Sequence, residues 1–459
     1  MPAIHGLFEP ELRWDWTAVP TNNSDFLHTL SFPLGFKWGV ADSAYQTEGS
    51  AYSGGKQCQN NWTAFEQARN AQGNSYIANG DCAGSACDRW NKMQEDVALI
   101  KASGFTIYRF SIEWSKLEPQ EGVFDSDVMQ HYIDFVDELR KNDIEPVIML
   151  FHHAWPLWFD AKGAFERAEN IADFVEFSEY IFEKLHEKVK IWMTINEPTG
   201  YAFEGYFRGN YPPCKKSLPL AGRVLRNFLD AHIAVYNAFK KHDHSVEVGY
   251  AKIVQPLDPY NPWNPIERLI AGIFDNLMND VDLYYFKTGI FNWSVPGQSL
   301  VYSTNPEAVG ALDFIGVNYY SHTSIKMHYR LHNIIAPAIH PHEKITSYGQ
   351  AIYPEGLYRS IQKCATLQKP MYVAENGVAD NTDELKQLFI KQHLHAVSKA
   401  CTDGYDVRGY FYWTLLDNFE WCKGYTQKFG LYAVDRTTQE RTLKPGSKSF
   451  ITFVQSQNT

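Results

Sequence analysis

The sequence predicts a single α/β domain, a (β/α)8 barrel, and three observations support that fold class. Short runs of β-branched and aromatic residues alternate along the chain with longer segments of helical periodicity. Eight such runs occur, and no clear linker divides them into groups. The 459 residues would suit two or three average domains, but an α/β barrel can hold several hundred residues around one core.

The eight predicted strands are distributed along nearly the whole chain. In order, they are residues 36–41, 106–112, 146–152, 190–196, 246–253, 314–318, 370–374 and 407–413. An open, doubly wound sheet would instead place a glycine-rich turn after its first strand, and no G-x-G-x-x-G stretch follows the first of these. We therefore expect a closed barrel with its active site at the C-terminal ends of the strands.

The segments between the strands have the periodicity of amphipathic helices. In segment 126–142, apolar residues recur at intervals of four, three and four, and charged residues occupy the other faces. Segments 171–185 and 383–400 repeat this pattern. We expect residues 1–31 to be an irregular N-terminal extension, residues 32–459 to form the barrel domain, and residues 328–344 to be a long βα loop.

Composition and charge narrow the classes of partner. The formal net charge is −11, which argues against a nucleic-acid backbone or an anionic membrane as partner. No stretch of about 18 apolar residues predicts a transmembrane helix, and the first residues lack the basic end and apolar block of a signal peptide. Seven scattered cysteines predict mostly reduced thiols in the cytoplasm. Cys82 and Cys87 are close enough in sequence to pair, but unpaired thiols are the simpler expectation.

Polar and aromatic side chains recur near the C-terminal ends of seven of the eight predicted strands. Core packing does not explain this, whereas an active site at the barrel mouth does. The residues are Gln46, Arg109, His152, Asn196, Glu197, Asn318, Tyr320, Glu375, Trp413, Glu420 and Trp421.

Glu197 and Glu375 each end an apolar strand, and barrel closure would bring both over one mouth. Two carboxyl groups at one cleft suit glycoside hydrolysis, in which one protonates the leaving oxygen while the other attacks or directs water. The acid must stay protonated near neutral pH and the nucleophile must stay ionised. A cation such as Arg109 near Glu375 would favour its charged form.

Each motif also has a structural interpretation. Glu197 precedes a proline, which commonly marks a helix start. Glu375 precedes Asn376 and Gly377, a pair that commonly forms a turn. The neighbours His152 and His153 have no third ligand at a metal-binding spacing, so we expect no metal site. The joint occurrence of these residues at successive strand ends favours function over the structural interpretation.

Seven stretches, in order, resemble the signatures of glycoside hydrolase family 1, the retaining β-glucosidase type. They are "FPLGFKWGVADSAYQTEG", "YRFSIEWSKLEP", "TINEP", "DFIGVNYY", "YPEGLY", "YVAENG" and "GYFYWTLLDNFEW" with "FGLYAVD" after it. The resemblance covers roughly residues 31–455, nearly the whole chain. It implies a single (β/α)8 catalytic barrel that needs neither cofactor nor metal, with a small β-glycoside as its partner.

The resemblance also implies roles for individual residues. Glu197 would be the general acid/base and Glu375 the nucleophile of a double displacement through a covalent glycosyl-enzyme. Arg109 and Tyr320 would contact the nucleophile, and Asn318 would support the acid/base. The residues implied to hold the non-reducing sugar, which is glucose or alternatively galactose or fucose, are Gln46, His152, Asn196, Glu420 and Trp421, with Trp413 as its floor.

The sequence departs from the family pattern mainly on the leaving-group side. His153-Ala154-Trp155 follows His152, where the family usually has an aromatic residue, Asp and Leu. Gln350 stands where a Trp platform for the leaving group is common, and the loop "GYFRGNYPPCKKS" is unusual. Elsewhere, Arg89 replaces a common His and Lys116 a common Arg.

Three other functions compete with the β-glucosidase interpretation. A 6-phospho-β-glycosidase would replace Glu420 with a small hydroxyl residue, because a carboxylate there repels phosphate, although Lys423 and Lys428 lie nearby in sequence. A non-catalytic glycoside-binding relative would lose one or both catalytic carboxylates, and both are present. A transglycosidase would share every catalytic residue, so it stays open.

Overall fold

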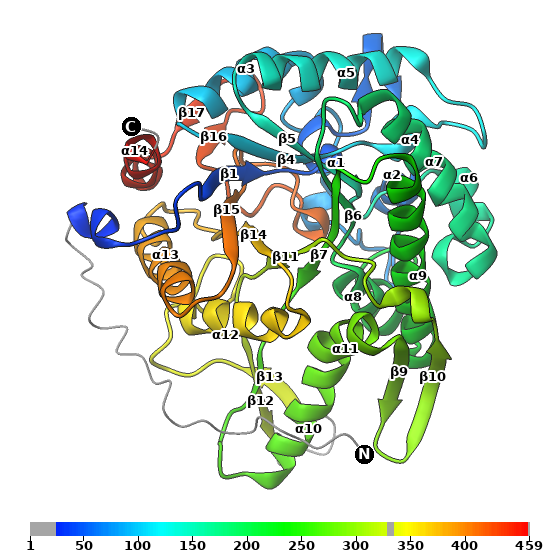
Figure 1. Cartoon of the computed structure of the whole chain (residues 1–459), viewed down its shortest axis with the longest axis vertical. Helices are drawn as coiled ribbons and strands as arrows, with labels where there is room; N and C mark the ends of the chain where they lie inside the picture. The colour runs from blue at the N-terminus through cyan, green and yellow to red at the C-terminus, as the bar shows by residue number, and fades with distance from the viewer. Residues whose placement is uncertain (1–23, 328–334, 458–459) are drawn as a thin grey trace.

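The computed structural model describes residues 24–327 and 335–457, and its centre is a closed barrel of eight parallel strands (Figure 1). Around the barrel, the hydrogen-bonded order is β1-β15-β14-β11-β7-β6-β5-β4. The strands are β1 (Lys37–Ala41), β4 (Ile107–Ser111), β5 (Glu145–Phe151), β6 (Ile191–Asn196), β7 (Glu247–Ile253), β11 (Phe314–Asn318), β14 (Met371–Asn376) and β15 (Val407–Trp413). All eight predicted strands are therefore confirmed, with ends shifted by two residues or fewer.

Helices follow the barrel strands and surround them (Figure 1). These helices are α3 (Arg89–Ala102), α5 (Ser126–Lys141), α7 (Ile171–Leu185), α9 (Leu218–His242), α11 (Val281–Thr288), α12 (Pro354–Cys364), α13 (Lys386–Thr402) and α14 (Lys448–Ser456). The predicted apolar stripe of α5 is buried at Val128, Tyr132, Phe135 and Leu139. The helix begins where the Asp125 side chain accepts hydrogen bonds from two backbone N–H groups, which is a strong N-cap.

Further elements lie in the loops that connect strands and helices. The additional helices are α1 (Ala44–Glu48), α2 (Asn61–Gln67), α4 (Trp114–Leu117), α6 (Leu157–Ala161), α8 (Pro198–Tyr201), α10 (Pro265–Asp275) and two π-helices, over Ala202–Arg208 and Asn276–Asp280, besides short 3-10 turns. The additional strands are β2 (Ala51–Tyr52), β3 (Lys56–Gln57), β8 (Leu257–Pro259), β9 (Ile290–Val295), β10 (Gln298–Thr304), β12 (Thr323–Met327), β13 (Ile335–Ala338), β16 (Tyr432–Val434) and β17 (Arg441–Leu443).

Two predictions about irregular segments need revision. Most of the expected N-terminal extension (residues 1–23) lies outside the described residues, but Ser24–Thr29 forms a 3-10 helix that packs on α13 and α14 with Leu27 buried. The segment 328–344 is not entirely a loop, because β13 pairs with β12, which also pairs with β8. The pattern hid this strand because it is short and includes Pro337, which suits the edge of a sheet. The domain boundary at residue 31 stays a prediction.

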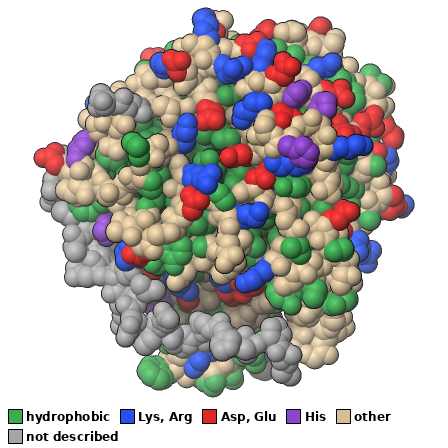
Figure 2. Space-filling view, in the orientation of Figure 1, with side chains coloured by type: hydrophobic (Ala, Val, Ile, Leu, Met, Phe, Trp, Pro, Cys, Tyr) green, Lys and Arg blue, Asp and Glu red, His purple; other side chains and the backbone are tan. Residues whose placement is uncertain are grey.

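The core has two layers, as expected for this fold. Side chains such as Val147, Met149, Met193 and Ala374 fill the barrel interior. A larger cluster fills the space between the barrel and its helices. On the face seen in Figure 2, acidic and basic side chains are interspersed. In the described part of the chain, no helix is both long enough and apolar enough to cross a membrane.

All seven cysteines are unpaired, so the simpler expectation for Cys82 and Cys87 is confirmed. Cys82 is exposed, whereas Cys87 is buried and its thiol lies 3.0 Å from the Asp417 carbonyl oxygen.

Arg89 and Lys116, two departures from the family pattern, contact the same buried carboxylate. Arg89 Nη2 lies 2.5 Å from Glu48 Oε1, and Lys116 Nζ lies 3.0 Å from Glu48 Oε2. The Tyr132 hydroxyl donates to Glu48 Oε2 at 3.0 Å. Burial raises the pKa of Glu48, but Lys116 and Arg89 outweigh this and lower it to about 2. Glu48 is therefore the shared counter-charge of both cations.

We expect Glu48→Gln to lower the free energy of unfolding by about 3–5 kcal/mol, because it leaves two buried cations without a counter-charge. Urea denaturation at neutral pH measures this. Since the pKa of Glu48 is lower in the folded chain, its contribution is complete above about pH 4.5 and is lost toward about pH 2. The gap between wild type and variant should narrow over that range. Glu121→Gln, at an exposed partner of Lys162, is the control and should cost less than about 1 kcal/mol; an equal loss in both variants would contradict the account.

Candidate active site

Glu197 and Glu375 lie at the C-terminal ends of β6 and β14. Glu197 directly follows β6 with φ +47°, and Pro198 opens α8 after it, so the expected helix start is real. Glu375 belongs to β14 itself and pairs in register with Asn318 of β11. Holding Glu197 in the left-handed region costs free energy, which the surrounding hydrogen bonds must offset.

The Asn-Gly pair after Glu375 does not depend on positive φ angles, which was the expected reason for a turn there. Neither Asn376 nor Gly377 has a positive φ. The Asn376 side chain donates to the Tyr319 carbonyl at 2.6 Å and accepts from the Tyr410 hydroxyl at 2.9 Å, which ties β14 to both neighbouring strands. A Cβ at Gly377 would lie 1.8 Å from the carbonyl oxygen of Trp413, so glycine is needed for close approach.

Glu375 is buried, and both of its carboxylate oxygens have donors. Arg109 Nη1 of β4 contacts Oε1 in a buried ion pair, and the Tyr320 hydroxyl donates to Oε2 at 2.6 Å. A full positive charge and a hydrogen bond thus converge on this side chain. Such surroundings are those of an ionised carboxylate.

Glu197 has surroundings of the opposite kind. Its described hydrogen-bond partner is neutral: Asn318 Nδ2 donates to Oε1 at 2.9 Å. Burial raises the pKa of Glu197, and the negative charge of Glu375 raises it further, to about 8. The two carboxyl groups therefore differ in the way that an acid and a nucleophile must differ.

Asn196 connects these groups to His152. Its Oδ1 accepts from Arg109 Nη2 at 2.6 Å and from Asn318 Nδ2 at 3.1 Å. Because arginine is only a donor, Oδ1 must face it and Nδ2 must point to His152 Nε2, 3.0 Å away. Burial lowers the pKa of His152 well below its usual value, which favours the neutral ring. Because Nε2 accepts from Asn196, the proton of that ring is assigned to Nδ1. That Nδ1 is buried without a hydrogen-bond partner among the described residues.

A second set of hydrogen-bonded side chains, around Gln46 and Glu420, forms another part of the site. Gln46 Nε2 donates to Glu420 Oε2 at 3.2 Å and to Asn418 Oδ1 at 3.3 Å, and the Ser43 hydroxyl donates to Gln46 Oε1 at 2.7 Å. Burial, followed by the charge of Glu375, raises the pKa of Glu420 to about 8. Sequence reasoning missed Ser43 and Asn418, which fix the Gln46 amide. Asn418 could have been noticed, because it lies within the quoted "DNFEW" stretch.

The predicted aromatic residues border the same space. The His152 ring lies 5.7 Å from that of Trp413 and 6.0 Å from that of Trp421, at interplanar angles of 25° and 22°. Tyr45 stacks on Trp421 at 6.1 Å with nearly parallel planes. The structure thus brings all eleven predicted site residues to one end of the barrel, linked by hydrogen bonds, ring contacts or the charges of the carboxyl groups.

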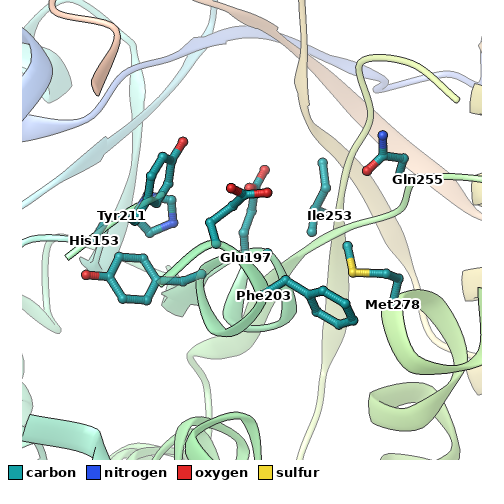
Figure 3. A pocket seen from close by; sticks show the side chains of 10 residues that line it. His153, Glu197, Phe203, Tyr211, Ile253, Gln255 and Met278 are labelled. Carbon is teal, nitrogen blue, oxygen red and sulfur yellow. The ribbon is translucent and has the colours of Figure 1, made fainter. Parts of the chain in front are cut away.

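A cavity of about 130 Å³ lies beside Glu197 (Figure 3). Glu197 lies in the middle, with His153 and Tyr211 on one side and Ile253, Gln255 and Met278 on the other. Gly200, Tyr201, Phe203 and Glu204 complete the lining. Gln350, where the family often has a Trp platform, does not line this cavity. Sequence reasoning noticed the unusual residue His153 but predicted no role for it.

No group of three or more His, Cys, Asp or Glu residues is placed to hold a metal ion within residues 24–327 and 335–457. His152 and His153 therefore belong to no such group there.

Comparisons with known proteins agree over nearly the whole chain. The family model described as "Glycosyl hydrolase family 1" matches residues 28–459. Beta-glucosidase A of Thermotoga maritima is 31% identical over 446 residues, which cover 91% of this chain and 96% of that protein. A solved beta-glycosidase from Pyrococcus horikoshii has a TM-score of 0.81 and 33% identity, covering 93% of this chain and 96% of its own.

A solved beta-glucosidase from Exiguobacterium marinum has a TM-score of 0.85 at 26% identity, covering 94% of this chain and 100% of its own. A match of this extent, in a closed parallel barrel with two carboxyl groups at its mouth, is sufficient evidence of membership: the chain belongs to glycosyl hydrolase family 1, a family of retaining glycosidases.

Proposed function

We propose that this enzyme hydrolyses terminal β-linked glucosides with retention of configuration, with Glu375 as nucleophile and Glu197 as acid/base. The observation that carries the proposal is the contrast between two carboxyl groups at one barrel mouth. Glu375 is held by a cation and a hydroxyl, whereas Glu197 is buried beside a neutral amide with its pKa raised to about 8. Double displacement requires that contrast.

In the first step, a Glu375 oxygen attacks the anomeric carbon as Glu197 gives its proton to the glycosidic oxygen. The bond to the leaving group breaks, an ester to Glu375 forms, and the leaving group departs as an alcohol. Arg109 and Tyr320 hold the attacking carboxylate in one orientation before and during attack. Once Glu375 is esterified, the charge that helped to raise the pKa of Glu197 is gone, which favours the base form needed next.

In the second step, Glu197 takes a proton from water, and the resulting hydroxide attacks the anomeric carbon. The ester breaks, Glu375 is free again, and the sugar leaves in the β configuration because two inversions have occurred.

The sugar itself would be held by donors and acceptors on its hydroxyls and by an aromatic plane on its C–H face. The proposed contacts are Gln46, His152, Asn196, Glu420 and Trp421, with Trp413 as the floor. The free Nδ1–H of His152 is a ready donor for a hydroxyl. We propose glucose as the preferred sugar, because the relatives compared above include beta-glucosidases. Galactosides and fucosides are further candidates.

The 6-phospho-β-glycosidase alternative is disfavoured at Glu420. This buried carboxyl accepts from Gln46, and no basic side chain contacts it among the described residues. Lys423 lies over the Tyr348 ring, 5.2 Å from its centroid. Transglycosylation differs only in the acceptor of the second step.

The unpaired state of all seven cysteines supports a reducing, cytoplasmic location.

We expect Glu375→Gln to lower kcat/KM for 4-nitrophenyl β-glucoside at least about a thousandfold, because the nucleophile is lost. Glu197→Gln should lose most activity on poor leaving groups but retain the first step on 2,4-dinitrophenyl β-glucoside, whose leaving group needs no proton. Azide should then raise turnover of Glu197→Gln by replacing water as the nucleophile. Full activity of Glu375→Gln, or a wild type inactive on every β-glycoside, would refute the proposal.

Wild type should also prefer the glucoside to its 6-phosphate.

The raised pKa of Glu197 predicts the alkaline limb of the pH profile. Above about pH 8 the carboxyl loses the proton that it must donate, so kcat/KM should fall as pH rises through that value. The fall should be marked for phenyl β-glucoside and much weaker for the 2,4-dinitrophenyl compound. Identical profiles for the two substrates would show that another group controls the limb. Thermal unfolding at each pH separates titration from loss of the fold.

A further inference from the structure

His153 is a buried side chain whose hydrogen-bonding capacity is not satisfied. The residue is 5% exposed, and neither Nδ1 nor Nε2 makes a well-aligned hydrogen bond within the described part of the chain. The backbone of Asn196 is near enough to act on the ring, but it can satisfy one nitrogen at most. The side chain borders the cavity beside Glu197 (Figure 3). A buried polar group without a partner costs free energy, so a bound molecule that supplies one should be favoured.

The fold fixes the position of His153. Its backbone has φ +70°, which a residue other than glycine adopts only when its surroundings enforce it. Its carbonyl accepts from Asn61 Nδ2 and from Trp62 Nε1, both at 3.0 Å. Asn61 Oδ1 also accepts from the backbone N–H of Trp155 at 3.0 Å. Asn61 therefore clamps both sides of this bend and holds the imidazole against the cavity.

The imidazole is neutral near neutral pH. Burial lowers the pKa of His153 to about 3, the backbone of Asn196 opposes this in part, and the Arg109 charge lowers the pKa further. A neutral imidazole carries one N–H donor and one acceptor nitrogen. A hydroxyl is the small group that can satisfy either nitrogen, because it both donates and accepts.

One wall of the cavity is apolar and can contact an apolar ring. Phe203, Ile253 and Met278 form this wall, next to the polar Gln255, and Glu197 separates Ile253 and Met278 from His153. Since Glu197 would protonate the glycosidic oxygen, the group attached to that oxygen would occupy this cavity. A volume of about 130 Å³ is close to that of a roughly 150 Å³ cavity that binds benzene, so it suits a single ring.

We propose that His153 is a specificity-determining residue that selects leaving groups with an apolar ring and a hydroxyl close to the glycosidic oxygen. This rests on the proposed function, because it assigns the leaving-group side of the same site. The hydroxyl would replace the missing partner of the imidazole, while the ring would contact the apolar wall.

The test compares two substrates of nearly equal shape: 2-(hydroxymethyl)phenyl β-glucoside and 2-ethylphenyl β-glucoside. Wild type should show a kcat/KM about tenfold higher for the hydroxymethyl compound, as expected for satisfying one buried polar group. His153→Phe should reduce the ratio to within about twofold. His153→Gln, which restores a donor and an acceptor, should keep more of the preference than His153→Phe.

His131→Phe is the matched control, because His131 stacks on Trp90 outside the site and its loss should leave the ratio unchanged. If His153→Phe does not fold, His153→Met takes its place. A wild-type ratio below about threefold, or a ratio unaffected by loss of the imidazole, overturns the inference. Either result with ordinary activity on both glucosides leaves the proposed function intact, whereas inactivity of wild type on both counts against the proposed function itself.

Discussion

The buried guanidinium of Arg109 is the contact on which the rest of the site depends. It is fully buried on β4 and reaches across the barrel mouth to Glu375 of β14 and to Asn196 of β6. A buried cation is costly unless it is paired, so the carboxylate and the amide oxygen must face it. That requirement orients Asn196, which in turn fixes the proton of His152 on Nδ1. Three strands are therefore held in register by a group that also sets the chemistry.

The same constraint explains why the two carboxyl groups differ. Arg109 can neutralise only one of them at contact distance, and it contacts Glu375. Glu197 then has a neutral partner, Asn318, and a negative charge nearby, so its neutral form is favoured. Asn318 also donates to Asn196, so one amide nitrogen joins the acid to the network around the nucleophile. The proposed acid and the proposed nucleophile are thus parts of one hydrogen-bonded unit, and changes to it should not be additive.

The barrel and its strand-end residues were predictable because periodicity and strand ends are local signals with a fixed meaning in this fold. Features that depend on which distant residues come together in the folded chain were not predictable. Gly377 is needed because of the Trp413 carbonyl, and Asn418 matters because Gln46 lies opposite it. The π-helix over Ala202–Arg208 likewise has no pattern that distinguishes it from an α-helix.

The degree to which neighbouring strands fix each side chain also explains where this chain can differ from its family. The sugar side is built by side chains whose orientation the closed barrel and Arg109 determine together, so a change there disturbs several strands at once. In our proposal the leaving-group side is built by loops and by His153, whose backbone is clamped by Asn61 while its ring faces the cavity. A side chain held in this way can change identity without moving the barrel. In the proposed site, chemistry and specificity are thus carried by different parts of the structure, and a change of leaving group would leave Glu197 and Glu375 in place.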